Sequence, residues 1–248
     1  MEHPTILVLQ PSDADPPARL GEWLTDAGAE LDVLRPFADP VPATAADYAG
    51  VVCLGGRMAA TDDLDHPWLA DVRRLLADAT RSRTAVLGVC LGAQLLAVAT
   101  GGRVAAGEHG PEAGPSLVAK RDAAWVDPLF ADLPLMPDVL QFHGDVIDPL
   151  PPGAELLAAS PRYPNQAFRI GGYGYGVQFH IETTPDLVRE WARDNDRVAA
   201  ALAPDALDQL DEAHEGIEQS WRPFTARFVD LAAGRLEPVG GRHGLPLV

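Results

Sequence analysis

A short apolar run that passes directly into a helix-forming stretch constrains this chain most. Residues 84–89 form the run, and their apolar, partly β-branched side chains predict a buried strand. Residues 94–99 predict the helix that follows, so Cys90 lies at the turn between them. Gly88 and Gly92 remove side chains that would block a sharp bend. Such a turn places the thiol above the carboxyl end of a sheet and at a helix N-terminus, whose partial positive charge favours the thiolate.

This stretch alone leaves two interpretations of Cys90 open. A free cysteine in an ordinary strand-helix unit is commonly a small buried hydrophobic residue. A nucleophile is the alternative, and it needs a base from elsewhere in the chain. The other cysteine, Cys53, lies in the middle of the apolar residues 50–54, so we expect it in the core.

Further apolar stretches predict the strands of a parallel sheet. Residues 5–9, 31–34 and 50–54 are the first three, with an amphipathic segment at 18–27 between the first two. This order is a βαβ unit, whose right-handed crossovers place helices on both faces of a sheet. A helix is also expected to end near Ala79. Later strand candidates, spaced by Pro and Gly turns, lie at residues 103–105, 139–143, 154–159, 166–170 and 175–179.

The chain beyond residue 194 is helical in pattern and acidic. Apolar spacing predicts helices at residues 186–194, 197–202, 205–214 and 217–233, followed by an extended Gly/Pro-rich tail at 234–248. We therefore expect an α/β domain over residues 1–194 and a helical extension with its tail over 195–248. The extension contains no catalytic motif and is either a helical cap or a dimerisation surface.

Composition excludes several classes of partner. A formal net charge of −17 over 248 residues disfavours nucleic acid and anionic membranes, because both need a basic patch. No stretch has the apolar length of a membrane span, and the N-terminus lacks a signal-peptide pattern, so a cytoplasmic protein is expected. The two cysteines suggest no disulfide framework, and no Cys/His cluster has zinc spacing. Neither a metal nor a cofactor is implied.

A second informative stretch runs from Tyr175 to Pro185. Side chains alternate in an extended segment, so His180 and Glu182 can share a face while Ile181 points into packing. Glu182 can then accept from one imidazole nitrogen while the other nitrogen faces a thiol. A lone histidine at a strand end is more often structural, but Glu182 and the upstream Cys90 favour the catalytic interpretation.

The pattern Gly-x-Cys90-x-Gly-x-Gln94, together with His180-x-Glu182 and Glu112-x-Gly114, resembles the class I (triad) glutamine amidotransferases, of the kind similar to the glutaminase part of GMP synthase. The resemblance covers roughly residues 50–191. It implies an α/β fold of three layers, with a mostly parallel, flavodoxin-like central sheet and flanking helices. One departure is Ile181, which stands where the family usually has proline.

The resemblance also implies roles for particular residues. Cys90 would be the nucleophile, His180 its general base and acid, and Glu182 the residue that orients the imidazole. The backbone N–H groups of Leu91 and of Gly56, or Gly55, would form the oxyanion hole. The glutamyl end of the substrate would be held at Gln94 and around Phe142 and His143, with His143 also the second candidate for the base.

Three hypotheses about activity follow. An independent hydrolase of glutamine or a small γ-glutamyl compound is favoured modestly, and γ-glutamyl peptidases share the implied fold. An amidotransferase subunit that passes ammonia to a separate synthase chain is the alternative, because the sequence has no synthase pyrophosphatase or phosphate loop. A catalytically idle binding protein is disfavoured by the intact Cys90, His180 and Glu182. A resemblance to the DJ-1/PfpI proteins is more distant and would not predict the His-x-Glu pair.

Overall fold

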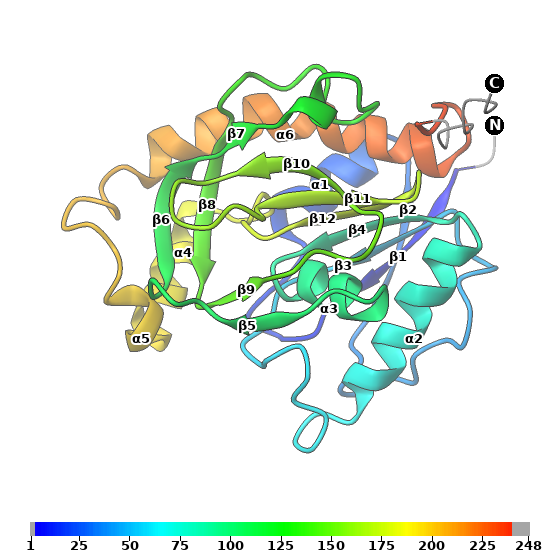
Figure 1. Cartoon of the computed structure of the whole chain (residues 1–248), viewed down its shortest axis with the longest axis horizontal. Helices are drawn as coiled ribbons and strands as arrows, with labels where there is room; N and C mark the ends of the chain where they lie inside the picture. The colour runs from blue at the N-terminus through cyan, green and yellow to red at the C-terminus, as the bar shows by residue number, and fades with distance from the viewer. Residues whose placement is uncertain (1–2, 240–248) are drawn as a thin grey trace, which may run out of the picture.

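A computed structural model describes residues 3–239, which are built around one sheet of eight strands (Figure 1). The strand order across the sheet is β2-β1-β3-β4-β12-β11-β10-β7. The bounds are β1 (Thr5–Leu9), β2 (Glu30–Leu34), β3 (Gly50–Cys53), β4 (Ala85–Val89), β7 (Ala119–Lys120), β10 (Glu155–Ala159), β11 (Ala167–Ile170) and β12 (Gly174–Val177).

The sheet is parallel on one side and antiparallel on the other. From β2 across to β12 every neighbouring pair is parallel, whereas β12, β11, β10 and β7 pair antiparallel. The mostly parallel α/β architecture predicted from the sequence is therefore confirmed, together with a mixed extension of the sheet by the later strands. Parallel strands place their carboxyl ends at one edge of the sheet, where polar side chains can converge.

Helices cover both faces of this sheet. Their bounds are α1 (Ala18–Asp26), α2 (Trp68–Arg81), α3 (Leu91–Ala99), α4 (Pro185–Asp194), α5 (Asp196–Ala199) and α6 (Leu210–Ala232), with a short 3-10 helix at Asp122–Trp125. Side chains alternate along β1, so Ile6 and Val8 belong to the hydrophobic cluster under α1 and α6. Leu7 and Leu9 belong to the cluster under α2 and α3. The result is the expected three-layer arrangement.

Two small antiparallel pairs lie beside the main sheet. β5 (Val104–Ala106) pairs with β9 (Asp145–Ile147), and β6 (Glu112–Leu117) pairs with β8 (Asp138–His143). An isolated bridge joins Leu140 of β8 to His180, which brings the end of β8 next to the segment that follows β12. The end of β8 and the start of β9, residues 142–145, line the functional site described below.

The C-terminal helices differ from the sequence-based expectation. One continuous helix, α6, replaces the two predicted at residues 205–214 and 217–233, and the helix predicted at 197–202 is the shorter α5, Asp196–Ala199. Gly216 weakens a helix in isolation, but α6 approaches β8 closely there, and a Cβ at this position would overlap the Asp138 carboxyl. Tertiary packing therefore carries the helix through the glycine. The predicted extended tail lies outside the described residues from 240 onward.

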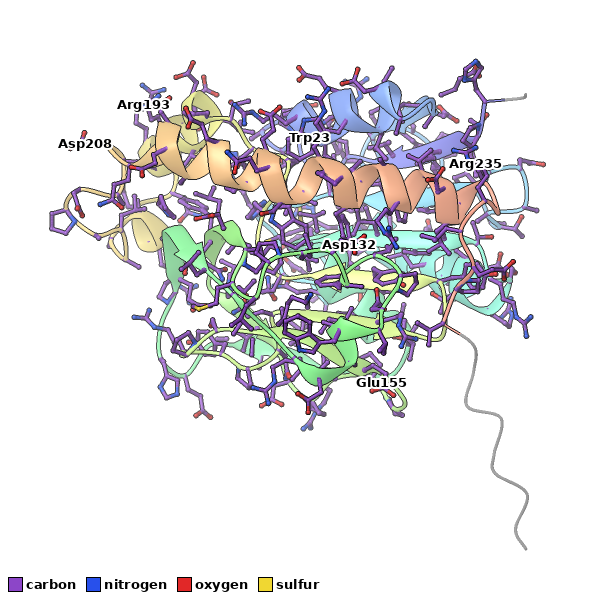
Figure 2. The ribbon with its side chains drawn as sticks, turned by 90° about the horizontal axis from the view of Figure 1, so that it is seen from above. Trp23, Asp132, Glu155, Arg193, Asp208 and Arg235 are labelled. Atoms are coloured by element: carbon purple, nitrogen blue, oxygen red, sulfur yellow. The ribbon has the colours of Figure 1, made fainter. Side chains whose placement is uncertain are left out.

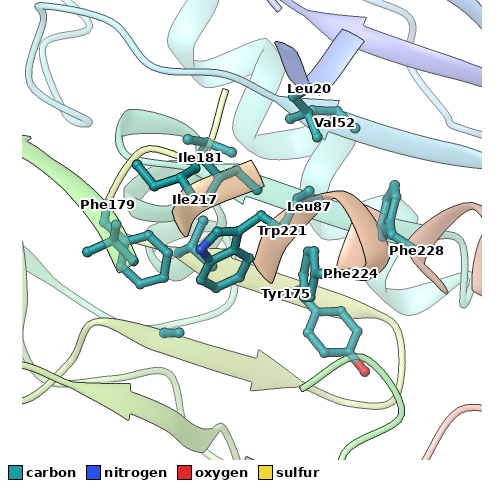
Figure 3. Packing of buried hydrophobic residues seen from close by; sticks show 14 of the residues in the cluster. Leu20, Val52, Leu87, Tyr175, Phe179, Ile181, Ile217, Trp221, Phe224 and Phe228 are labelled. Carbon is teal, nitrogen blue, oxygen red and sulfur yellow. The ribbon is translucent and has the colours of Figure 1, made fainter. Parts of the chain in front are cut away.

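α6 is packed into the core rather than against its edge. It runs along the molecule beside α1, as Figure 2 shows. Trp221, Phe224 and Phe228 are buried in the same cluster as Leu87 of β4 and Tyr175 of β12 (Figure 3). The boundary predicted at residue 195 remains a prediction about domain division, since both sides of it share this cluster. Among residues 3–239 no helix has the length and apolar character needed to cross a membrane.

Candidate active site

Cys90 lies at the turn between β4 and α3, as predicted, in a backbone conformation that few residues other than glycine adopt. Its φ is +51° and its ψ is −108°. Two hydrogen bonds hold the turn: Cys90 N donates to Val177 O of β12 at 2.8 Å, and Gln94 N donates to Cys90 O at 3.0 Å. The helix begins at Leu91, directly after the cysteine, rather than at residue 94.

The glycines on each side of Cys90 are required by close backbone packing. A Cβ atom at Gly88 would lie 2.5 Å from Gly92 O, and a Cβ atom at Gly92 would overlap the carbonyl oxygen of Cys53. Strand β3 and helix α3 therefore approach each other through Gly92, which fixes where α3 starts. The strained turn is held by this packing, as strained residues at functional sites generally are.

His180 and Glu182 form a buried pair beside this turn. His180 Nδ1 lies 2.7 Å from Glu182 Oε1, and Ile181 N donates to Glu182 Oε2 at 2.9 Å. Ile181 is fully buried among apolar side chains, as the alternation predicted. The Trp191 indole of α4 packs edge-on against the imidazole, with ring centroids 4.7 Å apart. Glu182 is thus placed to fix the tautomer and orientation of the ring.

Electrostatics at His180 favour the imidazolium form. Burial acts to lower the pKa of His180, but the Glu182 carboxylate and the hydrogen-bonded Cys90 outweigh it. The pKa of His180 therefore lies well above its ordinary value. A protonated imidazole thus contacts both the Cys90 sulfur and the Glu182 carboxylate.

A cavity of about 260 Å³ opens onto Cys90 and His180. Ligand pockets commonly measure about 300–1,000 Å³, so this one suits a molecule near the size of one amino acid with a short extension. It is lined by predicted residues from four different parts of the chain, Gly56, Cys90, Gln94, Phe142, His143 and His180.

The other predicted residues adjoin the cavity. Gly55 lies beside the imidazole, since a Cβ there would be 3.1 Å from His180 Cε1. Leu91 packs against Gly56, where a Cβ would be 2.7 Å from Leu91 Cδ2. All nine predicted site residues therefore gather in one place, while the chemical roles assigned to them remain predictions.

The polar contacts of His143 are with groups other than Cys90. Its Nδ1 lies 2.9 Å from Asp145 O, and its Nε2 lies 3.2 Å from Glu112 Oε2 at an angle poor for a hydrogen bond. Burial acts to raise the pKa of Glu112, but His143, Ser160 and Gln166 together lower it. Glu112 thus anchors the histidine, which favours His180 over His143 as the base.

Sequence reasoning missed several residues that the fold brings to this site. Gln178 Nε2 lies 3.8 Å from Cys90 Sγ, and Gln178 Oε1 accepts from Gln94 Nε2 at 3.2 Å. The sequence contains a signal for Gln178: it precedes His180 by two positions, and residues at that spacing in an extended segment share a face. Asp15 and Trp191 also line the cavity, and no local pattern marks either of them.

Cys53 is fully buried, as expected for a core residue, and burial raises the pKa of its thiol to about 12. Among residues 3–239, no three His, Cys, Asp or Glu side chains are grouped so that they could hold a metal ion.

GMP synthases and a gamma-glutamyl peptidase are among the proteins that are similar to this chain in sequence. GMP synthase [glutamine-hydrolyzing] of Thermomicrobium roseum is 46% identical over 97 residues, which is 39% of this chain and 18% of the synthase. The matched part of the chain thus corresponds to less than a fifth of that enzyme. Gamma-glutamyl peptidase 4 of Arabidopsis thaliana is 30% identical over 172 residues, 66% of each protein.

Solved structures support the same relationship. The crystal structure of a glutamine amidotransferase from Thermotoga maritima has a TM-score of 0.82 at 26% identity and covers 93% of this chain and 100% of its own. The model of the family described as glutamine amidotransferase class-I matches residues 20–195. The chain belongs to the class I glutamine amidotransferase family.

Proposed function

We propose that the protein is a cysteine-dependent hydrolase that cleaves the γ-glutamyl amide bond of glutamine or of a small γ-glutamyl compound. The observation that carries this proposal is the placement of Cys90 on a strained turn, with its thiol facing an imidazole that Glu182 holds at 2.7 Å. A carboxylate, an imidazole and a thiol in this order can generate a nucleophile at neutral pH.

The reaction runs through a thioester. The Cys90 thiolate attacks the γ-carbonyl carbon, and the oxyanion is held by the backbone N–H groups of Leu91 and Gly56. The C–N bond then breaks, and His180 gives its proton to the departing amine. Water attacks the γ-glutamyl thioester, His180 takes the proton from that water, and glutamate leaves with the thiol restored.

The remaining residues of the site hold the glutamyl group. Gln94, Phe142 and His143 line the cavity, and Gln94 is fixed by donating to Asp145 O and Gln178 Oε1 at 3.2 Å. Gly55 and Gly56 keep the backbone free to approach the reacting carbonyl, because any side chain there would meet His180 or Leu91.

The alternative is a subunit that passes ammonia to a separate synthase, which the similarity to GMP synthases supports. That similarity spans 18% of the synthase, whereas the similarity to the peptidase extends over 66% of the peptidase. The broader match favours an enzyme that acts independently. A cavity of about 260 Å³ also fits a small substrate.

The test is turnover by the purified protein without any added chain. Release of ammonia or amine and of glutamate is measured with glutamine and a panel of γ-glutamyl amides. We expect measurable hydrolysis, its loss in Cys90→Ala, and its retention in Cys53→Ala, the matched control thiol. A glutamine-like diazoketone should label Cys90 and leave Cys53 unmodified, since Cys53 is fully buried.

Two outcomes would contradict the proposal. If the purified protein hydrolyses no substrate of the panel but becomes active when a synthase partner is supplied, the subunit hypothesis holds instead. Turnover that survives Cys90→Ala would exclude the thioester route.

A further inference from the structure

One buried acidic group at the site has no role in the reaction described above. Asp15 lies in the loop between β1 and α1, is 6% exposed, and lines the same cavity as Cys90 and His180. Its Oδ2 has no hydrogen-bond partner among residues 3–239. A buried polar atom without a partner is costly and rare, so a ligand atom is the natural candidate to satisfy it.

Asp15 lies beside His180 in the cavity. A Cβ placed on Gly55 would be 3.1 Å from His180 Cε1 and 3.2 Å from Asp15 Oδ1, so the carboxyl and the imidazole are neighbours. The imidazole is the group that protonates the departing amine in the proposed reaction. The carboxyl is therefore near the departing nitrogen and what is attached to it.

The charged groups around Asp15 leave its oxygen available. Glu182 is engaged with His180, and Arg57 pairs with Asp194 at 3.3 Å. Burial raises the pKa of Asp15, with the Ser12 hydroxyl, His180 and Arg57 acting in the opposite direction. A cation placed against Oδ2 would favour the ionised carboxylate in the same way.

A positive side chain lines the cavity beside Gly144 and His143. Arg197 of α5 lines the cavity and lies 3.8 Å from the position of a Cβ on Gly144, next to His143. It is exposed and forms no ion pair within residues 3–239. A positive group near the glutamyl end suits an α-carboxylate, and a carboxylate near the leaving-group end suits a cation.

We propose, on the basis of the function given above, that Asp15 selects the leaving group. Its free Oδ2 accepts a hydrogen bond from an ammonium carried by the leaving amine. The preferred substrates are therefore γ-glutamyl conjugates of small diamines rather than glutamine or neutral amides. Hydrolysis releases glutamate and the diamine, and Asp15 exchanges no proton with the reacting atoms.

The experiment compares two amides of nearly identical shape. One is the γ-glutamyl amide of ethylenediamine. The other is the γ-glutamyl amide of n-propylamine, in which a methyl group replaces the ammonium. We expect kcat/KM to favour the charged amide by about 10- to 100-fold, the range for a hydrogen bond to a charged group. Asp15→Asn should lower kcat/KM for the charged amide more than for the neutral amide, so that the preference is lost.

Asp13→Asn is the matched control, because Asp13 is an exposed carboxylate in the same loop. It should keep the full preference for the charged amide. Equal kcat/KM values of the unmodified protein for the two amides would overturn the inference. An equal loss of kcat/KM for both amides in Asp15→Asn would overturn it as well, because that result indicates a structural role.

Binding separates this inference from the proposed hydrolysis. Cys90→Ala protein, which cannot turn over, is titrated with each amide, and the charged amide should bind more tightly only while Asp15 is present. Equal affinities for the two amides overturn the selection by Asp15 even if the enzyme hydrolyses both. No turnover of any substrate by the unmodified protein, with the difference in affinity intact, would overturn the proposed function alone.

Discussion

Opposite effects act on the protonation of His180. Burial disfavours its charged form, while the Glu182 carboxylate at 2.7 Å and the Cys90 thiol favour it, and the net effect raises its pKa. The imidazolium therefore persists to a pH at which an ordinary histidine would be neutral. Since the proposed reaction needs this proton for the departing amine, activity should extend to alkaline pH.

Glu182→Gln tests this coupling. The variant removes the charge that raises the pKa of His180, so the imidazolium is lost at lower pH than in the unmodified protein. We expect the alkaline limb of the profile of kcat/KM against pH to move down by about one to three units, the usual effect of one adjacent opposite charge. Glu190→Gln, an exposed carboxylate on α4, should leave the limb in place. An alkaline limb that does not move in Glu182→Gln would exclude His180 as its source.

Residues of the site could be predicted wherever a local pattern constrains geometry. Gly88 and Gly92 identify the turn of Cys90, and the period of two along an extended segment relates His180 to Glu182. Asp15 could not be predicted in this way. It meets His180 because the chain after β1 reaches past β3 and β4 to the segment after β12, where Arg19 N donates to Glu182 O at 3.0 Å, and only the folded chain brings these segments together.

At the scale of elements, the contact between β3 and α3 determines the position of Cys90. The helix approaches the strand through Gly92, and the hydrogen bond from Cys90 N to Val177 O ties the turn to β12. The turn thus depends on both neighbouring strands of the parallel sheet. Changes here should affect stability and activity together.

Gly92→Ala should destabilise the protein by about 1–3 kcal/mol or more, the usual cost of adding atoms to a closely packed core. The added methyl group would overlap the Cys53 carbonyl oxygen, which is backbone and cannot rotate away. Urea denaturation measures the change in the free energy of unfolding. Gly144→Ala is the control, because its nearest atom would be 3.8 Å away, at the end of the Arg197 side chain. Equal stability of the two variants would contradict the close approach of α3 to β3.

Element types were predictable from hydrophobic period, and the ends of helices were less so. β1, β3 and β4 are short apolar runs between turn residues, and the structure has them within a residue of the prediction. The break predicted near residues 215–216 was wrong. A glycine lowers helix propensity in isolation, but burial of Leu210 before it and of Ile217 and Trp221 after it stabilises the helix on both sides.

At the scale of the whole molecule, α6 links the C-terminal residues to the site. The Trp221 ring lies 5.1 Å from that of Phe179, centroid to centroid, and Phe179 directly precedes His180. Trp221 Nε1 also donates to Asp138 O, at the start of β8, at 2.8 Å. The helix thus braces the segment that carries the base and the strand that carries Phe142 and His143.

Trp221→Ala should therefore lower the free energy of unfolding by about 3–5 kcal/mol, as truncation of a buried large aromatic residue generally does. The loss combines apolar burial with an unpartnered carbonyl at Asp138. Gln219→Ala, an exposed position on the same helix, should change stability by less than about 0.5 kcal/mol. Chemical denaturation of the full chain measures both. A small effect of Trp221→Ala would mean that α6 is a dispensable cap, whereas the expected loss would make residues 195–239 part of the unit that folds around the site.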